Sequence, residues 1–189
     1  MMQDADPVRS APSGMTDGQR VVPSRAVSQE SFYPLQLMSL ARRRMGTEEN
    51  KALVRRLFQA IDEACKEGNA DILDEFLAPD FVEHNPFPGI PPTREGWKQA
   101  FKMFVDGAPG YHVVEDLLAE GDKVAGRITA YGTHEGDLFG IPRTGKQIRV
   151  AGMAIWRIKR GRIVEHWHET DQLGLMQQLS GIPRPEDRA

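Results

Sequence analysis

A chain of 189 residues, 40% of them hydrophobic, is long enough for one domain with a packed core and leaves little for a second. Its 24 basic and 27 acidic residues give a formal net charge of −3, which excludes the basic field typical of proteins that bind nucleic acid or anionic membranes. Cys65 is the single cysteine, so no disulfide forms within the chain, and no apolar run is long enough to span a bilayer. The first residues contain no apolar signal-peptide core. We therefore expect a soluble, cytoplasmic protein.

The first 46 residues differ in composition and in apolar patterning from the rest of the chain. Four prolines between Pro7 and Pro34 interrupt a segment without sustained apolar periodicity, which predicts a disordered tail. Within it, residues 31–40 (SFYPLQLMSL) could dock or form a short helix, and Met45 is an alternative start of the chain. We expect the folded domain to occupy residues 47–183, followed by a short tail over 184–189.

Helices are predicted in the first half of the domain. Thr47 is a suitable N-cap, and apolar residues between Leu53 and Cys65 recur at helical spacing until Gly68. A short second helix is expected over residues 70–77, stopped by Pro79. The proline-rich residues 80–92 should form an irregular connector, and a third helix should begin after Thr93.

Strands are predicted in the second half. The segments 111–120, 122–136, 147–159 and 162–170 read as strands, with turns at Gly121-Asp122 and Lys159-Arg160-Gly161, and residues 173–179 as a closing helix. Helices followed by an antiparallel meander indicate an α+β fold. A strongly curved antiparallel sheet wrapped around three helices would bury all the apolar faces.

The stretch HWHETD, residues 166–171, concentrates two histidines, a tryptophan and two carboxylates. In a regular strand the odd positions Ile163, Glu165, Trp167, Glu169 and Asp171 share one face, which looks more like a core face. A carboxylate held there in an apolar pocket would have a raised pKa and could serve as a general base. The alternative is that these acids are solvated, as most carboxylates are.

The even positions carry His166 and His168, a pair that could chelate zinc if a third ligand joined them. The other histidines form no recognised spacing with this pair, so we expect no metal and place both side chains toward solvent or a partner chain. His84 follows a short apolar element and precedes Asn85-Pro86. It is expected either at a pocket rim or as an ordinary surface residue. No nucleotide-binding loop or serine-nucleophile motif is present.

Four segments together resemble the SnoaL-like polyketide cyclase (ester cyclase) family. They are NKALVRRLF, GNADILDEFLAPDFVEHNPFPG, GTHEGDLFGIPRTGK and GRIVEHWHETDQLGLMQQLSG, and the resemblance covers about residues 48–182. It implies the nuclear transport factor 2-like cone, in which helices pack into a curved sheet with a pocket in its mouth. It also implies ring closure by intramolecular aldol condensation, without a metal or organic cofactor.

The resemblance further implies roles for individual residues. The family's general acid/base falls on Asp171, with Glu169 as its competitor, and a histidine that polarises the substrate falls on His84. Trp167 shares the strand face of Asp171 and is therefore expected to line the pocket, and His134, at the loop end of its strand, is expected at the pocket rim. Met153 and Trp156 have opposite parity on one strand, so at most one of them should line the cavity. The expected substrate is a small, mostly apolar carbonyl or polyketide-like compound.

Other functions fit the same residues. One is an isomerase like ketosteroid isomerase, and another is a limonene-type epoxide hydrolase, which needs an arginine such as Arg127 or Arg157 between two aspartates. A third is a non-catalytic module for ligand binding or dimerisation. We expect a homodimer, and the face carrying His166 and His168 could be the one buried against the second chain.

Overall fold

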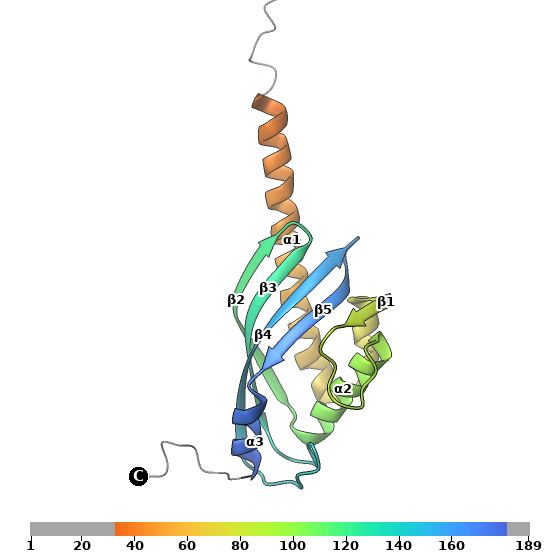
Figure 1. Ribbon diagram of the computed structural model, residues 1–189, viewed down its shortest axis with the longest axis vertical. Coiled ribbons are helices and arrows are strands. Elements are labelled where there is room, and N and C mark those ends of the chain that lie inside the picture. The colour runs from red at the N-terminus through yellow and green to blue at the C-terminus, as the bar shows by residue number, and fades with distance from the viewer. Residues whose placement is uncertain (1–32, 181–189) are drawn as a thin grey trace, which may run out of the picture.

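The structure is a computed structural model that describes residues 33–180 of the chain (Figure 1). Its elements, in chain order, are α1 (Tyr33–Glu67), the 3₁₀ helix η2 (Ala70–Glu75), β1 (Leu77–Glu83), α2 (Arg94–Gly107), β2 (Gly110–Glu120), β3 (Lys123–Thr133), β4 (Gln147–Lys159), β5 (Arg162–Thr170) and α3 (Gln172–Ser180).

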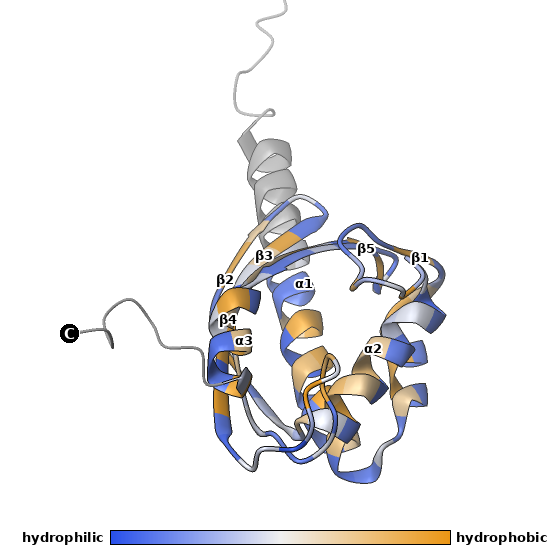
Figure 2. Ribbon diagram, turned by 60° about the horizontal axis from the view of Figure 1, so that its bottom comes forward, coloured by the Kyte–Doolittle hydropathy of each residue, from blue (hydrophilic) through white to orange (hydrophobic). Residues whose placement is uncertain are grey.

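One five-stranded sheet in the order β1-β5-β4-β3-β2 forms the body of the fold. Strands β2 to β5 are an antiparallel meander, as predicted, and α1 and α2 lie inside the curve of the sheet (Figures 1 and 2). The turn between β4 and β5 consists of Arg160 and Gly161, both with positive φ, which suits a tight hairpin between twisted strands. The predicted α+β cone is confirmed.

Strand β1 corrects the prediction for residues 77–83, which were assigned to the end of a helix and to an irregular connector. It pairs in parallel with β5, so the sheet is mixed rather than wholly antiparallel. Pro79 is tolerated because β1 is an edge strand, where a missing N–H can face away from the sheet. The pairing is irregular between Leu77 and Val82, on either side of this proline.

The predicted start of α2 agrees with the structure, and the predicted start of α1 does not. Thr93 caps α2 as expected, because its Oγ1 accepts a hydrogen bond of 3.2 Å from the Gly96 N–H. Helix α1 begins at Tyr33, well before the N-cap predicted at Thr47, and its first turns extend beyond the sheet (Figure 1). Residues 1–32 of the predicted tail, and residues 181–189, lie outside the described part of the chain.

The main core lies between α1 and the sheet (Figure 2). Val54, Leu57 and Ile61 of α1 are buried in the same cluster as Trp156. Gly126 makes room for that indole, since a Cβ at this position would lie 3.0 Å from the Trp156 ring. The concave face of the sheet is therefore shaped around Trp156, which also reaches the cavity described below.

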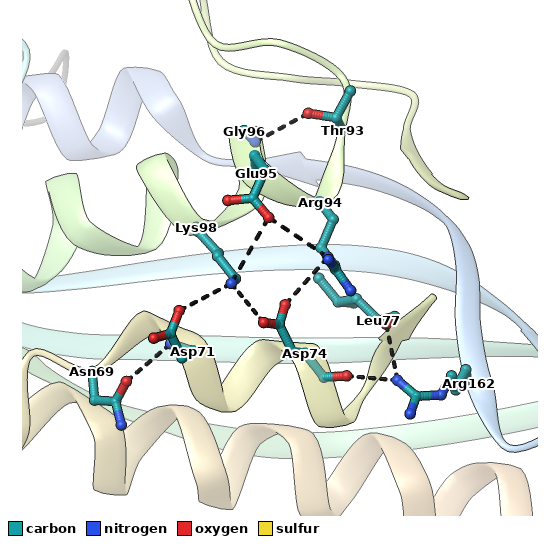
Figure 3. Close-up of polar contacts among 10 residues, drawn as sticks. All are labelled: Asn69, Asp71, Asp74, Leu77, Thr93, Arg94, Glu95, Gly96, Lys98 and Arg162. Atoms are coloured by element: carbon teal, nitrogen blue, oxygen red, sulfur yellow. Dashed lines mark hydrogen bonds and ion pairs between the residues drawn. The ribbon is translucent and has the colours of Figure 1, made fainter. Parts of the chain in front are cut away.

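A network of ion pairs fixes α2 over η2 (Figure 3). Lys98 Nζ lies 3.0 Å from Asp71 and 2.8 Å from Asp74, and the hydrogen bond from Lys98 lowers the pKa of Asp74. Arg162, at the start of β5, donates to the backbone carbonyl oxygens of Asp74 and Leu77. These contacts hold α2, one wall of the cavity, in place against the β1–β5 edge of the sheet.

Within residues 33–180, every helix is too short or too polar to cross a membrane.

Candidate active site

A cavity of about 250 Å³ opens between the helices and the concave face of the sheet. Its walls are mainly aromatic and aliphatic: Phe58, Phe87, Trp97, Phe101, Phe104, Tyr111, Tyr131, Phe139 and Trp156 are among the lining residues. The polar side chains in the lining include His112, His166, His168 and Glu169. An apolar cavity with a few convergent polar groups is the usual form of a small-molecule site.

A β-bulge in β5 decides which side chains of HWHETD face the cavity. Ile158 pairs with Ile163 but the preceding Arg157 pairs with Glu165, so Val164 is an extra residue in the strand. Beyond the bulge the parity is reversed, and His166 lies on the same side of the sheet as the buried Ile163. The prediction that Trp167 lines the pocket is therefore wrong, whereas Glu169 of the same odd-numbered set does line it.

His166 and His168 instead line the cavity, which corrects their predicted exposure to solvent or to a partner chain. Each ring presents its Nδ1 to the carboxylate of Glu83 on β1: His166 at 2.5 Å from Oε2 and His168 at 3.3 Å from Oε1. The two imidazoles are stacked, and Trp156 also stacks on His166. All three polar groups of this Glu83–His166–His168 cluster are largely buried.

Burial and hydrogen bonding shift the pKa values of Glu83 and His166 in opposite directions. Burial favours a raised pKa for Glu83, but the hydrogen bonds from His166 and His168 outweigh it and lower the pKa to about 2. Burial lowers the pKa of His166, although Glu83 opposes the effect. The cluster is thus an ionised carboxylate that holds a neutral His166.

The hydrogen-bond pattern fixes which ring nitrogen is free to react. An ionised carboxylate only accepts, so Nδ1 of each histidine carries the hydrogen. In a neutral imidazole the lone pair is then on Nε2, which in both rings has no hydrogen-bond partner among the described residues. The cluster can therefore take up a proton from a molecule in the cavity.

The same three residues are also a possible metal-binding set, because their ligand atoms lie within 4.8 Å of one another. Glu83 supplies the third ligand that the histidine spacing alone does not indicate. Glu83 itself could have been identified only if residues 77–83 had been recognised as a strand. Phe81 and Glu83 are buried there, while their neighbours Asp80, Val82 and His84 are exposed.

Asp171 and His84 lie elsewhere. Asp171 is exposed and caps α3, its Oδ1 accepting a 2.8 Å hydrogen bond from the Gly174 N–H. The His84 ring stacks on Trp167 with a centroid distance of 4.3 Å, and its Nε2 lies 3.1 Å from Glu165. Neither residue lines the cavity, and nor does Trp167.

The other predicted substrate-binding residues divide into two groups. Glu169, Met153 and Trp156 line the cavity. The expectation that at most one of Met153 and Trp156 would do so is wrong, although Met153 is largely exposed and Trp156 is buried, as opposite faces require. His134 is fully buried, with its Nδ1 2.9 Å from Thr144, and does not belong to the rim.

The arginines needed for an epoxide hydrolase arrangement are engaged on other acids. Arg127 forms an ion pair with Asp116, and Arg157 with Glu165 at 2.5 Å. Within residues 33–180 neither arginine contacts Asp171, so the Asp-Arg-Asp arrangement does not form there.

Comparison with known proteins agrees with the fold. The sequence profile described as SnoaL-like polyketide cyclase matches residues 42–179. The aklanonic acid methyl ester cyclase DauD of Streptomyces sp. (strain C5) is 34% identical over 139 residues, which cover 70% of this chain and 82% of DauD. The nogalonic acid methyl ester cyclase of Streptomyces nogalater is 30% identical over 133 residues, covering 66% of this chain and 94% of that protein. The solved structure of TsrD from Streptomyces laurentii, 32% identical, has a TM-score of 0.61 and covers 69% of this chain and 97% of TsrD.

Proposed function

Because the chain belongs to the SnoaL-like polyketide cyclase family, we propose that it closes a ring by intramolecular aldol condensation on a small, mostly apolar, polyketide-like carbonyl compound. The proposed reaction uses no metal and no organic cofactor. The relatives are named for the methyl esters of aklanonic acid and nogalonic acid, so an aromatic polyketide methyl ester is the natural class of substrate to test. An aromatic-lined cavity suits such a compound.

The observation that carries this proposal is the Glu83–His166–His168 cluster in the wall of an otherwise apolar cavity. We assign the base to His168. Its side chain is more exposed than that of His166, 14% against 7%, and it lies farther from Glu83. His166 and Glu83 would then be positioning residues that fix its tautomer and orientation.

The chemistry follows from this assignment. Nε2 of His168 removes a proton from the carbon next to a carbonyl group, and the electron pair of the broken C–H bond forms an enolate. The enolate carbon attacks a second carbonyl carbon, so a C–C bond forms and the carbonyl π electrons move to oxygen. Protonation of that oxygen completes the aldol, with no net oxidation or reduction.

Two other carboxylates are weaker candidates for the base. Glu83 has a pKa of about 2 and both of its oxygens are hydrogen-bonded, so it has little affinity for a further proton. Asp171 is exposed and engaged in capping α3.

The test compares His168→Gln and Asp171→Asn with the unmodified protein, using aklanonic acid methyl ester and nogalonic acid methyl ester as substrates. A positioned general base contributes roughly 10²- to 10⁴-fold. We therefore expect kcat to fall at least about 100-fold in His168→Gln and to stay within about threefold in Asp171→Asn. Loss of activity in Asp171→Asn with retention in His168→Gln would reverse the assignment.

A second assay separates the base from ring closure. Exchange of the α-protons of 1-tetralone with D₂O, followed by NMR, reports enolisation without any cyclisation. Exchange that depends on His168 but comes with no ring closure of either ester would favour an isomerase-type reaction. No exchange above the buffer rate would favour a binding module.

We also propose that the protein is a homodimer, but not through the face carrying His166 and His168, because that face lines the cavity. The outer face of the sheet carries one apolar row across four strands: Leu118, Ala125, Ile155 and Trp167 are register partners in turn. Leu118 is 75% exposed and Ile155 41%. An exposed apolar row is a feature of protein–protein interfaces.

A further inference from the structure

A second carboxylate–histidine pair reaches the same cavity from a different wall. His112 of β2 lines the cavity, and its Nδ1 lies 2.7 Å from Oδ1 of Asp62 on α1. The backbone N–H of His112 also donates to both carboxylate oxygens of Asp62, at 3.1 Å each. Asp62 therefore holds His112 by three contacts, one to the ring and two to the backbone N–H, and it directs Nδ1, rather than Nε2, toward itself.

Two aromatic rings separate this pair from the Glu83–His166–His168 cluster. The ring centroid of His112 lies 5.2 Å from that of Phe58, and Phe58 lies 5.9 Å from Trp156. Trp156 in turn stacks on His166 at 5.5 Å. Because Phe58 and Trp156 both line the cavity, a flat molecule that lies against them can reach an imidazole at each end.

The two imidazole sites differ in how a positive charge would be balanced. Asp62 contacts one histidine, so one carboxylate charge is available for one imidazolium. Glu83 contacts two histidines, so it cannot balance a proton on each of them. A carboxylate on Nδ1 stabilises an imidazolium, whose Nε2–H is then a donor. The Asp62–His112 pair is thus suited to give a proton, and the Glu83 cluster to take one.

We propose that His112, positioned by Asp62, is the proton donor for the carbonyl oxygen that the enolate attacks. This inference rests on the proposed function, since it assigns the second proton transfer of the same aldol reaction. As the C–C bond forms and the carbonyl π electrons move to oxygen, the Nε2–H bond breaks and a new O–H bond forms. His112 becomes neutral and His168 has gained the proton from carbon, so the charges balance and no redox partner is needed.

The positions of Phe58, Trp156 and His112 also define the shape of the ligand. The ligand is planar, spans Phe58 and Trp156, and carries a hydrogen-bond acceptor oxygen at the His112 end. An analogue of the same shape without that oxygen should bind less tightly, because it leaves the His112 donor without a partner.

The test uses binding, so it does not depend on turnover. The chain has five histidines, and protein labelled with ¹⁵N-histidine gives few ring resonances to assign. His112→Gln identifies the His112 signals by their loss. The probes are 1-tetralone, which has a carbonyl oxygen, and tetralin, the hydrocarbon of the same shape.

We expect 1-tetralone, but not tetralin, to move the Nε2 signal of His112 toward the protonated range. We also expect 1-tetralone to bind at least about fivefold more tightly than tetralin, a preference that His112→Gln abolishes and His168→Gln retains. Equal responses to the two probes, or a preference that survives in His112→Gln, would overturn the inference. A preference lost only in His168→Gln would also overturn it.

Asp62→Asn tests the positioning role. It should leave the folded spectrum intact and make the Nε2 signal of His112 insensitive to 1-tetralone, because the amide does not balance an imidazolium. An unchanged response in Asp62→Asn would contradict the role given to Asp62. If the proposed function were wrong instead, the α-proton exchange of 1-tetralone would not depend on His168, whereas these binding readouts would be unaffected.

Discussion

Glu83 and His166 are register partners on the parallel strands β1 and β5, and Oε2 of Glu83 lies 2.5 Å from Nδ1 of His166. The pair is almost completely buried. An edge strand that carries a proline thus supplies the carboxylate that orients both histidines of the cavity.

This pair makes stability depend on pH. The pKa of Glu83 is lowered from 4.5 to about 2 in the folded protein, so its contribution is present above pH 4.5 and is lost as the pH falls toward 2. The shift corresponds to on the order of 3 kcal/mol. His166 acts in the same direction, because its pKa is lowered from 6.5 and the unfolded chain takes up a proton more readily. Urea unfolding between pH 7 and pH 3 should show a steady loss of stability.

Glu83→Gln removes the acidic part of that profile. The variant should be less stable than the unmodified protein at pH 7 and should lose less stability between pH 4.5 and pH 3. Glu75→Gln, which changes an exposed glutamate on η2, is the matched control and should keep the original profile. Parallel profiles for Glu83→Gln and the unmodified protein would show that Glu83 is not the group responsible.

Much of the fold could be predicted because local signals agree with it. The cap at Thr93 and the turn at Arg160-Gly161 each specify their element within a few residues. The helical spacing from Leu53 to Cys65 specifies the second half of α1 and its end, but not its start at Tyr33. The family resemblance then supplied the cone and its pocket. The helix, the cap and the turn depend on short-range periodicity and on turn chemistry, which the sequence displays directly.

The site was harder to predict because two irregularities control it. The bulge at Val164 reverses the alternation of β5, so the strand presents His166 and His168 to the cavity instead of Trp167. The pairing of β1 with β5 brings Glu83 across from a distant part of the chain. Neither the bulge nor a parallel pairing leaves a local pattern that alternation can detect.

Asp171 is expected to contribute to stability rather than to catalysis. Its Oδ1 accepts the Gly174 N–H in the first turn of α3, whose Leu175 and Leu179 are buried. Asp171→Ala removes this cap and should lower the free energy of unfolding by about 1 kcal/mol, whereas Asp171→Asn, also a good cap, should change it much less. Chemical denaturation of the two variants checks this. A loss of kcat in Asp171→Asn without a loss of stability would contradict it.

A charge placed in the exposed apolar row on the outer face of the sheet should disrupt the proposed dimer. Ile155→Lys places a charge in the middle of the row formed by Leu118, Ala125, Ile155 and Trp167. Light scattering coupled to size exclusion should show a dimer for the unmodified protein and a monomer for this variant. Leu173→Lys changes an apolar residue on α3 that is even more exposed, 69% against 41% for Ile155, and should remain a dimer. A monomeric unmodified protein, or an Ile155→Lys dimer of unchanged affinity, would contradict the proposed interface.

Ring closure should not depend on a metal ion, even though Glu83, His166 and His168 are a possible ligand set. Zinc–nitrogen and zinc–oxygen bonds of about 2.0–2.2 Å in a tetrahedral site keep ligand atoms roughly 3.3 Å apart or more. Oε2 of Glu83 and Nδ1 of His166 are only 2.5 Å apart, which is a hydrogen-bond separation. The same oxygen and nitrogen cannot share both a proton and a metal ion.

We therefore expect the rate with aklanonic acid methyl ester, and the thermal unfolding midpoint, to be the same after dialysis against EDTA and after readdition of zinc. A rate that falls with EDTA and returns with zinc, but not in Glu83→Gln, would instead assign the cluster to a metal.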